Sequence, residues 1–114
     1  MGVKKVENKI NFNEGTLSFW VPKGAIDYDD NKFIYLINHN SPDGYFKIVK
    51  DKDNGIKVLY DYFNNGKCEL KASAGELDDN DKHHVAVTWS LKERNIKLYI
   101  DGQERDSCEI DITP

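Results

Sequence analysis

Tyrosine, histidine and asparagine side chains gather in the middle of this 114-residue chain. Tyr60 and Tyr62 would share one face of a strand, and Tyr45 follows a turn-forming segment that contains His39 and Asn40. Flat aromatic rings stack on the apolar faces of pyranose sugars, while Asn, Asp and His side chains bind the hydroxyl groups. These five residues are therefore predicted to contact a carbohydrate, with packing in a core as the alternative for each tyrosine.

Acidic residues are the next candidates, because carboxylate and carbonyl oxygens are the ligands of calcium. One predicted loop carries Asp27, Asp29 and Asp30, and residues 78–81 carry three more aspartates. Residues 51–55 lack the Gly and Glu that an EF-hand loop needs at its sixth and twelfth positions, so a tight turn is predicted there. Solvated surface charge is the commoner role of such clusters. No cofactor is predicted, and calcium is kept as an alternative.

The adjacent residues His83 and His84 could bind a metal ion or act as a base. They open a stretch of β-branched and aromatic residues that is typical of a strand. Neighbouring side chains of a strand point to opposite faces, so the two imidazoles cannot share one ion. The pair is therefore interpreted as part of a strand, and no metal site is predicted.

The strongest strand patterns cover residues 83–90 and 96–102. Apolar side chains recur at every second position in both, and the short polar connection suits an antiparallel hairpin. Asp101-Gly102 is a strong two-residue turn signal, so a third strand should fold back from Gln103. These three strands are predicted to form the central piece of an antiparallel sheet.

Turn signals separate further short strands, for a total of about nine, at the spacing typical of all-β sandwiches. The others are predicted at residues 4–12, 16–21, 33–38, 45–50, 56–63 and 67–73. Residues 4–12 are interpreted as an edge strand guarded by lysines, and residues 33–38 as a strand near a sheet centre. No amphipathic helix is evident. The predicted fold is all-β, a two-sheet antiparallel β-sandwich with about four or five strands in each sheet.

The predicted core consists of apolar residues that share the inward faces of these strands. They are Leu17, Phe19, Val21, Ile34, Leu36, Val85, Val87, Trp89, Ile96, Leu98 and Ile100. Trp20 is also expected in the core, because it stands in a strong strand.

Composition and charge narrow the classes of partner. The length suits a single domain over residues 1–114, and the net charge of −4 comes from well-mixed acids and bases. No basic block is present, so nucleic acid and membranes are not predicted partners. No signal peptide is evident, since residues 1–5 are not followed by an apolar stretch. The chain is expected to be intracellular or to be a domain of a larger secreted protein.

Cys68 and Cys108 are the only two cysteines in the sequence. Two cysteines are too few for a disulfide framework and show no metal-ligand spacing. A single disulfide would suit an extracellular chain, and two buried free thiols are the alternative.

Three motifs, in this order, resemble the laminin-G-like, concanavalin A-like lectin/glucanase superfamily. They are GTLSFWV at residues 15–21, HHVAVTW at residues 83–89 and KLYIDG at residues 97–102. The sequence departs from the family at Asp81-Lys82, where family members often have a tryptophan, and it ends soon after the third motif. The resemblance implies a jelly-roll sandwich that binds carbohydrate or protein at a cell surface, often with calcium, and that in some members cleaves glycans.

Members that hydrolyse glucans carry an E-[IL]-D-[IVL]-x-E run whose carboxylates act as nucleophile and acid/base. Glu109 and Asp111 resemble the beginning of that run, but Thr113-Pro114 follows and the last carboxylate is missing. Retaining hydrolysis needs two carboxyl groups about 5.5 Å apart. The similarity is interpreted as chance, and hydrolase activity is disfavoured.

A non-catalytic, lectin-like module that binds carbohydrate is the predicted function. A structural, self-assembling or protein-binding domain is the alternative, and a glycan hydrolase is the least favoured. The expected partners are carbohydrate or a cell-surface protein, and a homo-oligomer is left open. An extracellular or cell-surface location is expected if the chain comes from a larger secreted protein.

Overall fold

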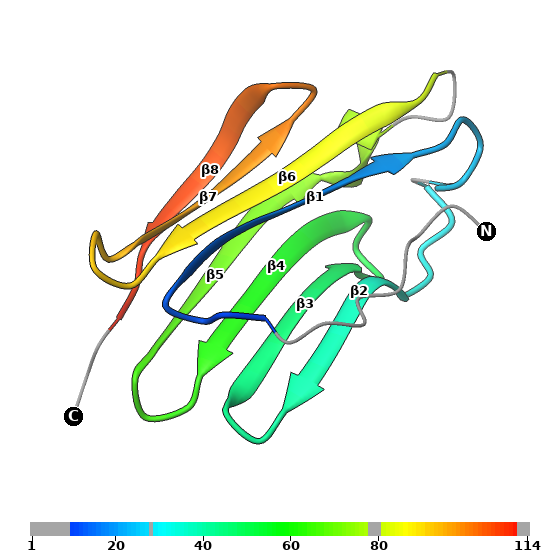
Figure 1. Cartoon of the computed structure of the whole chain (residues 1–114). Coiled ribbons are helices and arrows are strands. Elements are labelled where there is room, and N and C mark those ends of the chain that lie inside the picture. Colours follow the sequence, from blue (N-terminus) through cyan, green and yellow to red (C-terminus); the bar gives the residue numbers. More distant parts are fainter. Residues whose placement is uncertain (1–9, 28, 78–80, 112–114) are drawn as a thin grey trace.

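A computed structural model describes residues 10–27, 29–77 and 81–111. Eight strands form two antiparallel sheets of four, which lie as two layers in Figure 1. One sheet has the order β1-β6-β7-β8 and the other the order β2-β3-β4-β5. The strands are β1 (Glu14–Val21), β2 (Ile34–Ser41), β3 (Gly44–Lys50), β4 (Gly55–Tyr62), β5 (Gly66–Ser73), β6 (His83–Ser90), β7 (Asn95–Ile100) and β8 (Gln103–Glu109).

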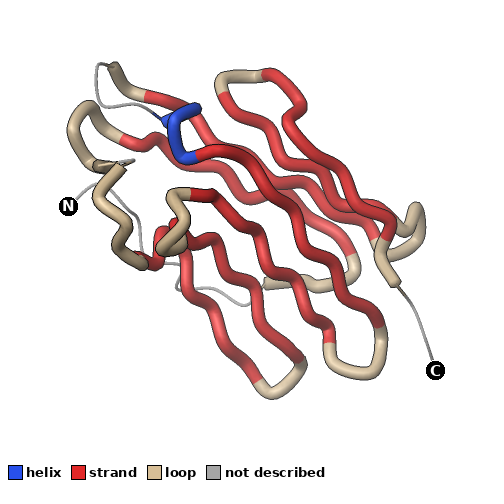
Figure 2. Tube along the Cα trace, turned by 180° about the vertical axis from the view of Figure 1, so that it is seen from behind, coloured by secondary structure: helices blue, strands red, loops and turns tan. Residues whose placement is uncertain are grey.

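Strands make up most of the described chain, and one short 3-10 helix, η1 (Ala74–Leu77), joins β5 to β6 (Figure 2). In the part of the chain that the structure describes, no helix is long and apolar enough to cross a membrane. The predicted all-β, two-sheet antiparallel sandwich is confirmed.

The two chain ends differ from the predicted strands. Most of the edge strand predicted at residues 4–12 lies outside the described residues, and residues 10–12 are not in a strand. Phe12 instead packs into the core with 4% of its surface exposed. The strand that was predicted to fold back from Gln103 is present and ends at Glu109, after which Asp111 makes one isolated bridge to Lys67.

The core lies between the two sheets, where alternate side chains of each strand meet. Nine of the eleven predicted core residues are buried, and Leu17 is partly buried against them. The ring of Phe46 in β3 lies 4.9 Å from the ring of Trp89 in β6, measured between centroids, and so joins the layers. Burial of these apolar side chains is the main driving force for the sandwich.

Two core predictions are wrong for reasons of strand geometry. Trp20 is 54% exposed, because it alternates with Phe19 and Val21 and therefore points outward from β1. Ile34 is 37% exposed at the start of β2. The pairing register shifts between Tyr35 and Ile37, and such a bulge changes which residues face the core. Strand β2 is also an edge strand and not the central strand that was predicted.

One side of the sandwich is joined across the two sheets at β5 and β8. Cys68 of β5 and Cys108 of β8 form a disulfide with their Cα atoms 6.2 Å apart. Of the two alternatives for these cysteines, the single disulfide is therefore correct and the two free thiols are not. The Lys71 backbone N–H also donates a 2.8 Å hydrogen bond to the Asp106 carboxylate. We refer to this side as the β5–β8 seam.

Candidate functional site

Strand alternation separates the five predicted contact residues. His39 and Asn40 lie within β2 and not in a turn, because the hairpin between β2 and β3 turns at residues 42–43 alone. Asn40 pairs with Tyr45 across the hairpin, and both lie on the outer face of the sheet. His39 points to the opposite face, where its ring centroid is 6.4 Å from that of Phe12.

Tyr60 and Tyr62 lie on the inner face of β4, as their shared spacing requires. Tyr60 is 1% exposed, and its hydroxyl donates a 2.6 Å hydrogen bond to the backbone oxygen of Phe12. Burial raises the pKa of Tyr60 to about 12. Tyr62 stacks on Phe12 at the edge of the core, with ring centroids 5.2 Å apart. The Tyr60 ring is buried in the core, and its predicted contact with a ligand stays a prediction.

The outer face of the same sheet carries a groove of about 410 Å³, which we term the outer groove. It lies along β3, β4 and β5 and reaches the β5–β8 seam. Its lining includes Tyr45, Leu59, Asp61, Lys67 and Glu69 from these strands. Glu109 and Asp111, from the segment at the end of β8, also line it. The volume is within the range of ligand pockets in proteins.

Tyr45 is the aromatic residue of the outer groove. Its ring packs edge-on against Phe63, with centroids 6.2 Å apart, and the Lys47 ammonium lies 4.9 Å from its ring centroid. Partial burial raises the pKa of Tyr45, and the Asp61 carboxylate raises it further through its charge and its hydrogen bond with the phenol. A ring with a fixed carboxylate beside it can stack on an apolar surface and bind a hydroxyl group together.

Exposed aromatic side chains continue beyond Tyr45 on this sheet. Phe33 and Tyr35 are 45% and 50% exposed and pack edge to face at 5.0 Å. The Lys47 ammonium lies 5.7 Å from the Tyr35 ring, so the lysine connects Tyr35 with Tyr45. We refer to Phe33, Tyr35, Tyr45 and Phe63 as the aromatic strip. Its members other than Tyr45 were missed, and alternation along the strand was the signal that could have found Tyr35.

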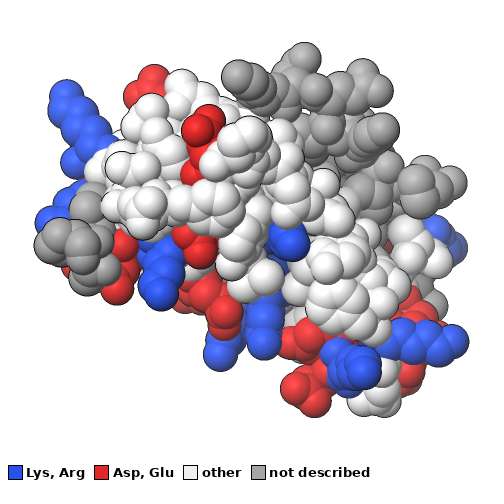
Figure 3. Space-filling view, turned by 90° about the horizontal axis from the view of Figure 1, so that it is seen from below, with Lys and Arg blue, Asp and Glu red and all other residues white. Residues whose placement is uncertain are grey.

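Charged side chains of both signs are interspersed with uncharged surface on the face seen from below (Figure 3). A continuous basic patch is not visible there, in agreement with the mixed charge pattern of the sequence.

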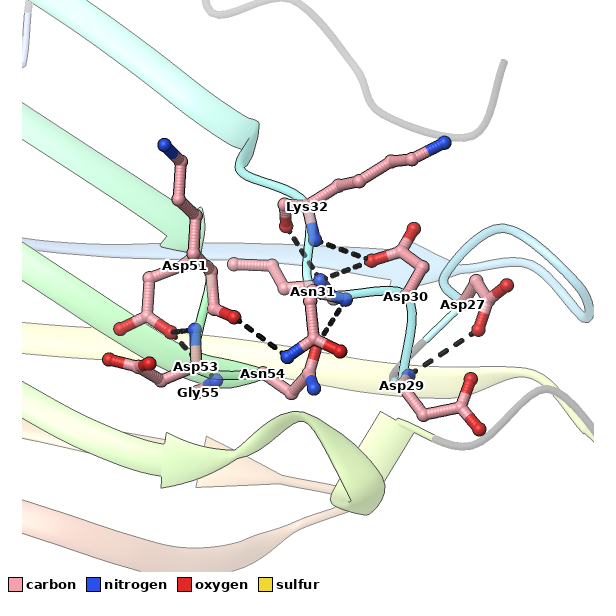
Figure 4. Close-up of polar contacts among 11 residues, drawn as sticks. Asp27, Asp29, Asp30, Asn31, Lys32, Asp51, Asp53, Asn54 and Gly55 are labelled. Carbon is pink, nitrogen blue, oxygen red and sulfur yellow. Dashed lines mark hydrogen bonds and ion pairs between the residues drawn. The ribbon is translucent and has the colours of Figure 1, made fainter.

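In the acidic loop between β1 and β2, the Asp30 carboxylate is occupied by contacts with the protein itself. Asp30 accepts hydrogen bonds from the Lys50 ammonium at 2.6 Å and from the Lys32 backbone N–H at 2.9 Å (Figure 4). Lys50 is 1% exposed, and its hydrogen bond lowers the pKa of Asp30. Asp51 accepts from two backbone N–H groups of its own turn, those of Asp53 and Gly55.

Calcium binding needs six to eight oxygen ligands around one point. Within the described ranges, no group of three His, Cys, Asp or Glu side chains is placed to hold a metal ion. Asp78 and Asp79 lie outside the described residues, and Asp81 accepts a hydrogen bond from the Lys82 backbone N–H. The described carboxylates therefore do not fit the calcium site that the family resemblance implied.

The histidine pair of β6 points to opposite faces, as its strand position predicted. The Nδ1 atom of His83 lies 2.7 Å from the Asp101 carboxylate, while the His84 ring lies 4.9 Å from the exposed Trp20 ring. The hydrogen bond with His83, followed by that from the His84 backbone N–H, lowers the pKa of Asp101. These contacts tie the start of β6 to the turn between β7 and β8.

The carboxylates of the outer groove differ in burial from the acid of a glycoside hydrolase. One carboxyl group of such a pair keeps its proton because apolar surroundings bury it. Glu69, Glu109 and Asp111 are exposed, and Asp61 is partly exposed beside the Tyr45 hydroxyl. None of these described groups is buried, so the groove lacks this feature of a hydrolase site.

The chain is similar in sequence to known proteins. A family model described as the concanavalin A-like lectin/glucanases superfamily matches residues 3–113. The chain is 29% identical over 96 residues to mouse (Mus musculus) "Sushi, von Willebrand factor type A, EGF and pentraxin domain-containing protein 1". That match covers 80% of the chain, which spans about 2% of the length of the relative. No solved structure gives a significant match.

Proposed function

Since the chain belongs to the concanavalin A-like lectin/glucanases superfamily, we propose that it is a non-catalytic module that binds carbohydrate in the outer groove. The observation that carries the proposal is Tyr45, which lines this groove on the outer face of β3 beside the Asp61 carboxylate. A sugar ring can stack on the phenol ring while Asp61 accepts a hydrogen bond from a hydroxyl group. Of the five residues predicted from the sequence, Tyr45 and Asn40 remain candidate contacts.

Asn40 can complete the recognition of the sugar. It is exposed and pairs with Tyr45 across the β2–β3 hairpin, and its amide nitrogen donates a 3.0 Å hydrogen bond to the Asn38 side chain. That bond fixes the orientation of the amide and leaves its oxygen able to accept from a sugar hydroxyl. The proposed contacts thus combine one stacking surface with two fixed polar groups.

We further propose that residues 1–114 act as one domain within a multidomain protein at the cell surface or outside the cell. The Cys68–Cys108 disulfide supports an oxidising compartment. The relative, by its printed name, combines several domain types, and the chain matches a small fraction of it. Both observations agree with a modular binding domain whose partner is a glycan or a surface glycoprotein.

A glycan array tests this function, with calcium and with a chelator. We expect binding to at least one glycan, and we expect Tyr45→Ala to weaken it about tenfold or more, since loss of one stacking contact is worth roughly 1–2 kcal/mol. Tyr99→Ala is the matched control, because Tyr99 is a partly exposed tyrosine on the other sheet. An array with no bound glycan in either condition, or a Tyr45→Ala variant that binds normally, would contradict the proposal.

The aromatic strip favours a second candidate, binding to protein or to another copy of the chain. Phe33, Tyr35 and Phe63 are 42–50% exposed, and contiguous exposed apolar surface is typical of interaction sites. Light scattering distinguishes this candidate from a sugar-binding module. A mass above 13.1 kDa that returns to this value in Tyr35→Ala would support self-assembly through the strip.

A further inference from the structure

We infer that the outer groove selects saccharides that carry a free amine, namely amino sugars in their cationic form, over N-acetylated and acidic saccharides. The inference rests on the proposed carbohydrate-binding function and concerns the class of ligand. The groove and its aromatic ring define the site, and the charges around them decide among sugars.

The outer groove has an uneven charge. Four carboxylates line it, those of Asp61, Glu69, Glu109 and Asp111, against the single ammonium of Lys67. The whole 114-residue chain has a net charge of only −4, so negative charge is concentrated at this groove. A concave surface lined by one sign of charge raises the local concentration of ligands of the opposite sign.

Other groups of the protein neutralise these carboxylates only in part. Glu69 has an ion pair with Lys71 at 3.7 Å, but both side chains are largely exposed, and such pairs contribute little. The neighbour of Asp61 in the groove is the phenol of Tyr45, which is uncharged at neutral pH and does not neutralise the carboxylate. The Glu109 and Asp111 carboxylates make no ion pair with a residue of the described chain. The groove therefore presents net negative charge to a ligand.

The aromatic ring of the groove favours the same ligand. A cation over the face of a tyrosine ring is attracted by the negative charge of its π system. The Lys47 ammonium lies 4.9 Å from the Tyr45 centroid, so one cation already neighbours this ring, and a ligand amine would have to lie nearer the four carboxylates. A sugar carboxylate or sulfate would face the same ring and the same carboxylates with the opposite charge.

Titration calorimetry with three oligosaccharides of equal length tests the inference: oligomers of glucosamine, N-acetylglucosamine and galacturonate. At mildly acidic pH, where the amine is protonated, we expect the glucosamine oligomer to bind about tenfold tighter than the N-acetylated one. The preference should decrease with added salt, because screening weakens exposed charges. The galacturonate oligomer should bind most weakly.

Variants separate the charge effect from the rest of the site. We expect the double variant Glu109→Gln/Asp111→Asn to lose most of the tenfold preference for the amine form. Glu104→Gln is the matched control, since Glu104 is an exposed carboxylate of β8 that pairs with Lys97 and does not line the groove. An unchanged preference in the double variant, or an equal loss in the control, would overturn the inference.

The binding results distinguish a failure of the inference from a failure of the proposed function. If the N-acetylated or the galacturonate oligomer binds as tightly as the glucosamine oligomer, the inference is wrong and the carbohydrate-binding function stands. If no saccharide binds, the function and the inference both fail. If a lysine-rich peptide binds as tightly as the glucosamine oligomer and Tyr45→Ala does not affect it, the groove recognises cationic protein and the inference is wrong.

Discussion

Tyr60 stabilises the protein through its hydroxyl group, which lies in the core. The hydrogen bond to the Phe12 backbone oxygen holds the N-terminal segment against β4. A phenol in this position is expected to stay neutral, because ionisation would place a charge in an apolar environment without a partner. Tyr45, a residue of the same type one strand earlier, is on the outer face and serves the candidate site.

We predict that Tyr60→Phe lowers the free energy of unfolding by about 1–2 kcal/mol, because it removes this hydrogen bond and leaves a buried carbonyl oxygen without it. Urea denaturation measures the change, with Tyr99→Phe as the control. An effect no larger than that of the control would show that the hydroxyl does not hold Phe12.

The raised pKa of Tyr60 also predicts how stability changes in alkali. The unfolded chain loses the phenol proton near pH 10, whereas the folded state keeps it until about pH 12. Unfolding is therefore favoured as pH rises through this window, and the stability of the native protein should fall there by roughly 2–3 kcal/mol. Tyr60→Phe should lack this part of the decrease, which urea titrations at several alkaline pH values would reveal.

The connection from β1 to β2 depends on β3. Lys50 stands at the end of β3, and its ammonium donates hydrogen bonds of 2.6 Å to the Asp30 carboxylate and to the Lys32 backbone oxygen. The lysine is 1% exposed while Asp30 is 26% exposed. The two partners therefore differ in how easily water can replace the interaction.

We predict that Asp30→Asn destabilises the protein, because it leaves the buried Lys50 ammonium without its counter-charge. Lys50→Met should destabilise less, since water can hydrate the Asp30 carboxylate. Asp29→Asn, on the same loop, is the control and should leave the stability close to that of the wild type. Chemical denaturation of the three variants compares them, and equal effects of Asp30→Asn and Lys50→Met would contradict this asymmetry.

The ion pair between Lys50 and Asp30 also makes the stability of the β1–β2 connection depend on pH. The pKa of Asp30 is lowered in the folded state by the Lys50 hydrogen bond, so the contribution is present above the unfolded value of 3.8. It is lost as pH falls through the lowered folded value, because the carboxyl group then becomes neutral. The acid sensitivity that this pair causes should be absent from Lys50→Met.

On the scale of the whole molecule, the disulfide joins the two layers at the β5–β8 seam. Cys68 and Cys108 are 40 residues apart in the chain, and both contact the outer groove. A covalent link of this span restricts the unfolded chain much more than the folded one. The disulfide thus contributes to stability and holds one side of the candidate site.

We predict that the double variant Cys68→Ala/Cys108→Ala loses about 4 kcal/mol of unfolding free energy, from the loop-closure entropy of a 40-residue separation. The ligand affinity of the outer groove should decrease as well, because the segment at the end of β8 is then tied to β5 by hydrogen bonds without a covalent link. Urea denaturation with and without a thiol reductant measures the first effect. The reductant should destabilise the wild type and leave the double variant unchanged; equal stability of the oxidised and reduced wild type would contradict the prediction.

The sequence alone determined the local pattern of this protein. The hairpin of β6 and β7, the turn at Asp101-Gly102 and the outward and inward sets of β1 follow from period-two alternation and turn chemistry, which act between neighbouring residues. For the same reason the motifs on these strands were sufficient to suggest the family.

The tertiary structure decided which face of each mixed strand is buried. Alternation places Tyr60 and Tyr62 together on one side of β4, but either side could have faced the core until the second sheet covered one of them. The bulge that exposes Ile34, the pairing of Cys68 with Cys108 and the outer groove at the β5–β8 seam arise from contacts between segments distant in the chain. Local periodicity carries no information about such contacts, because packing between layers selects them.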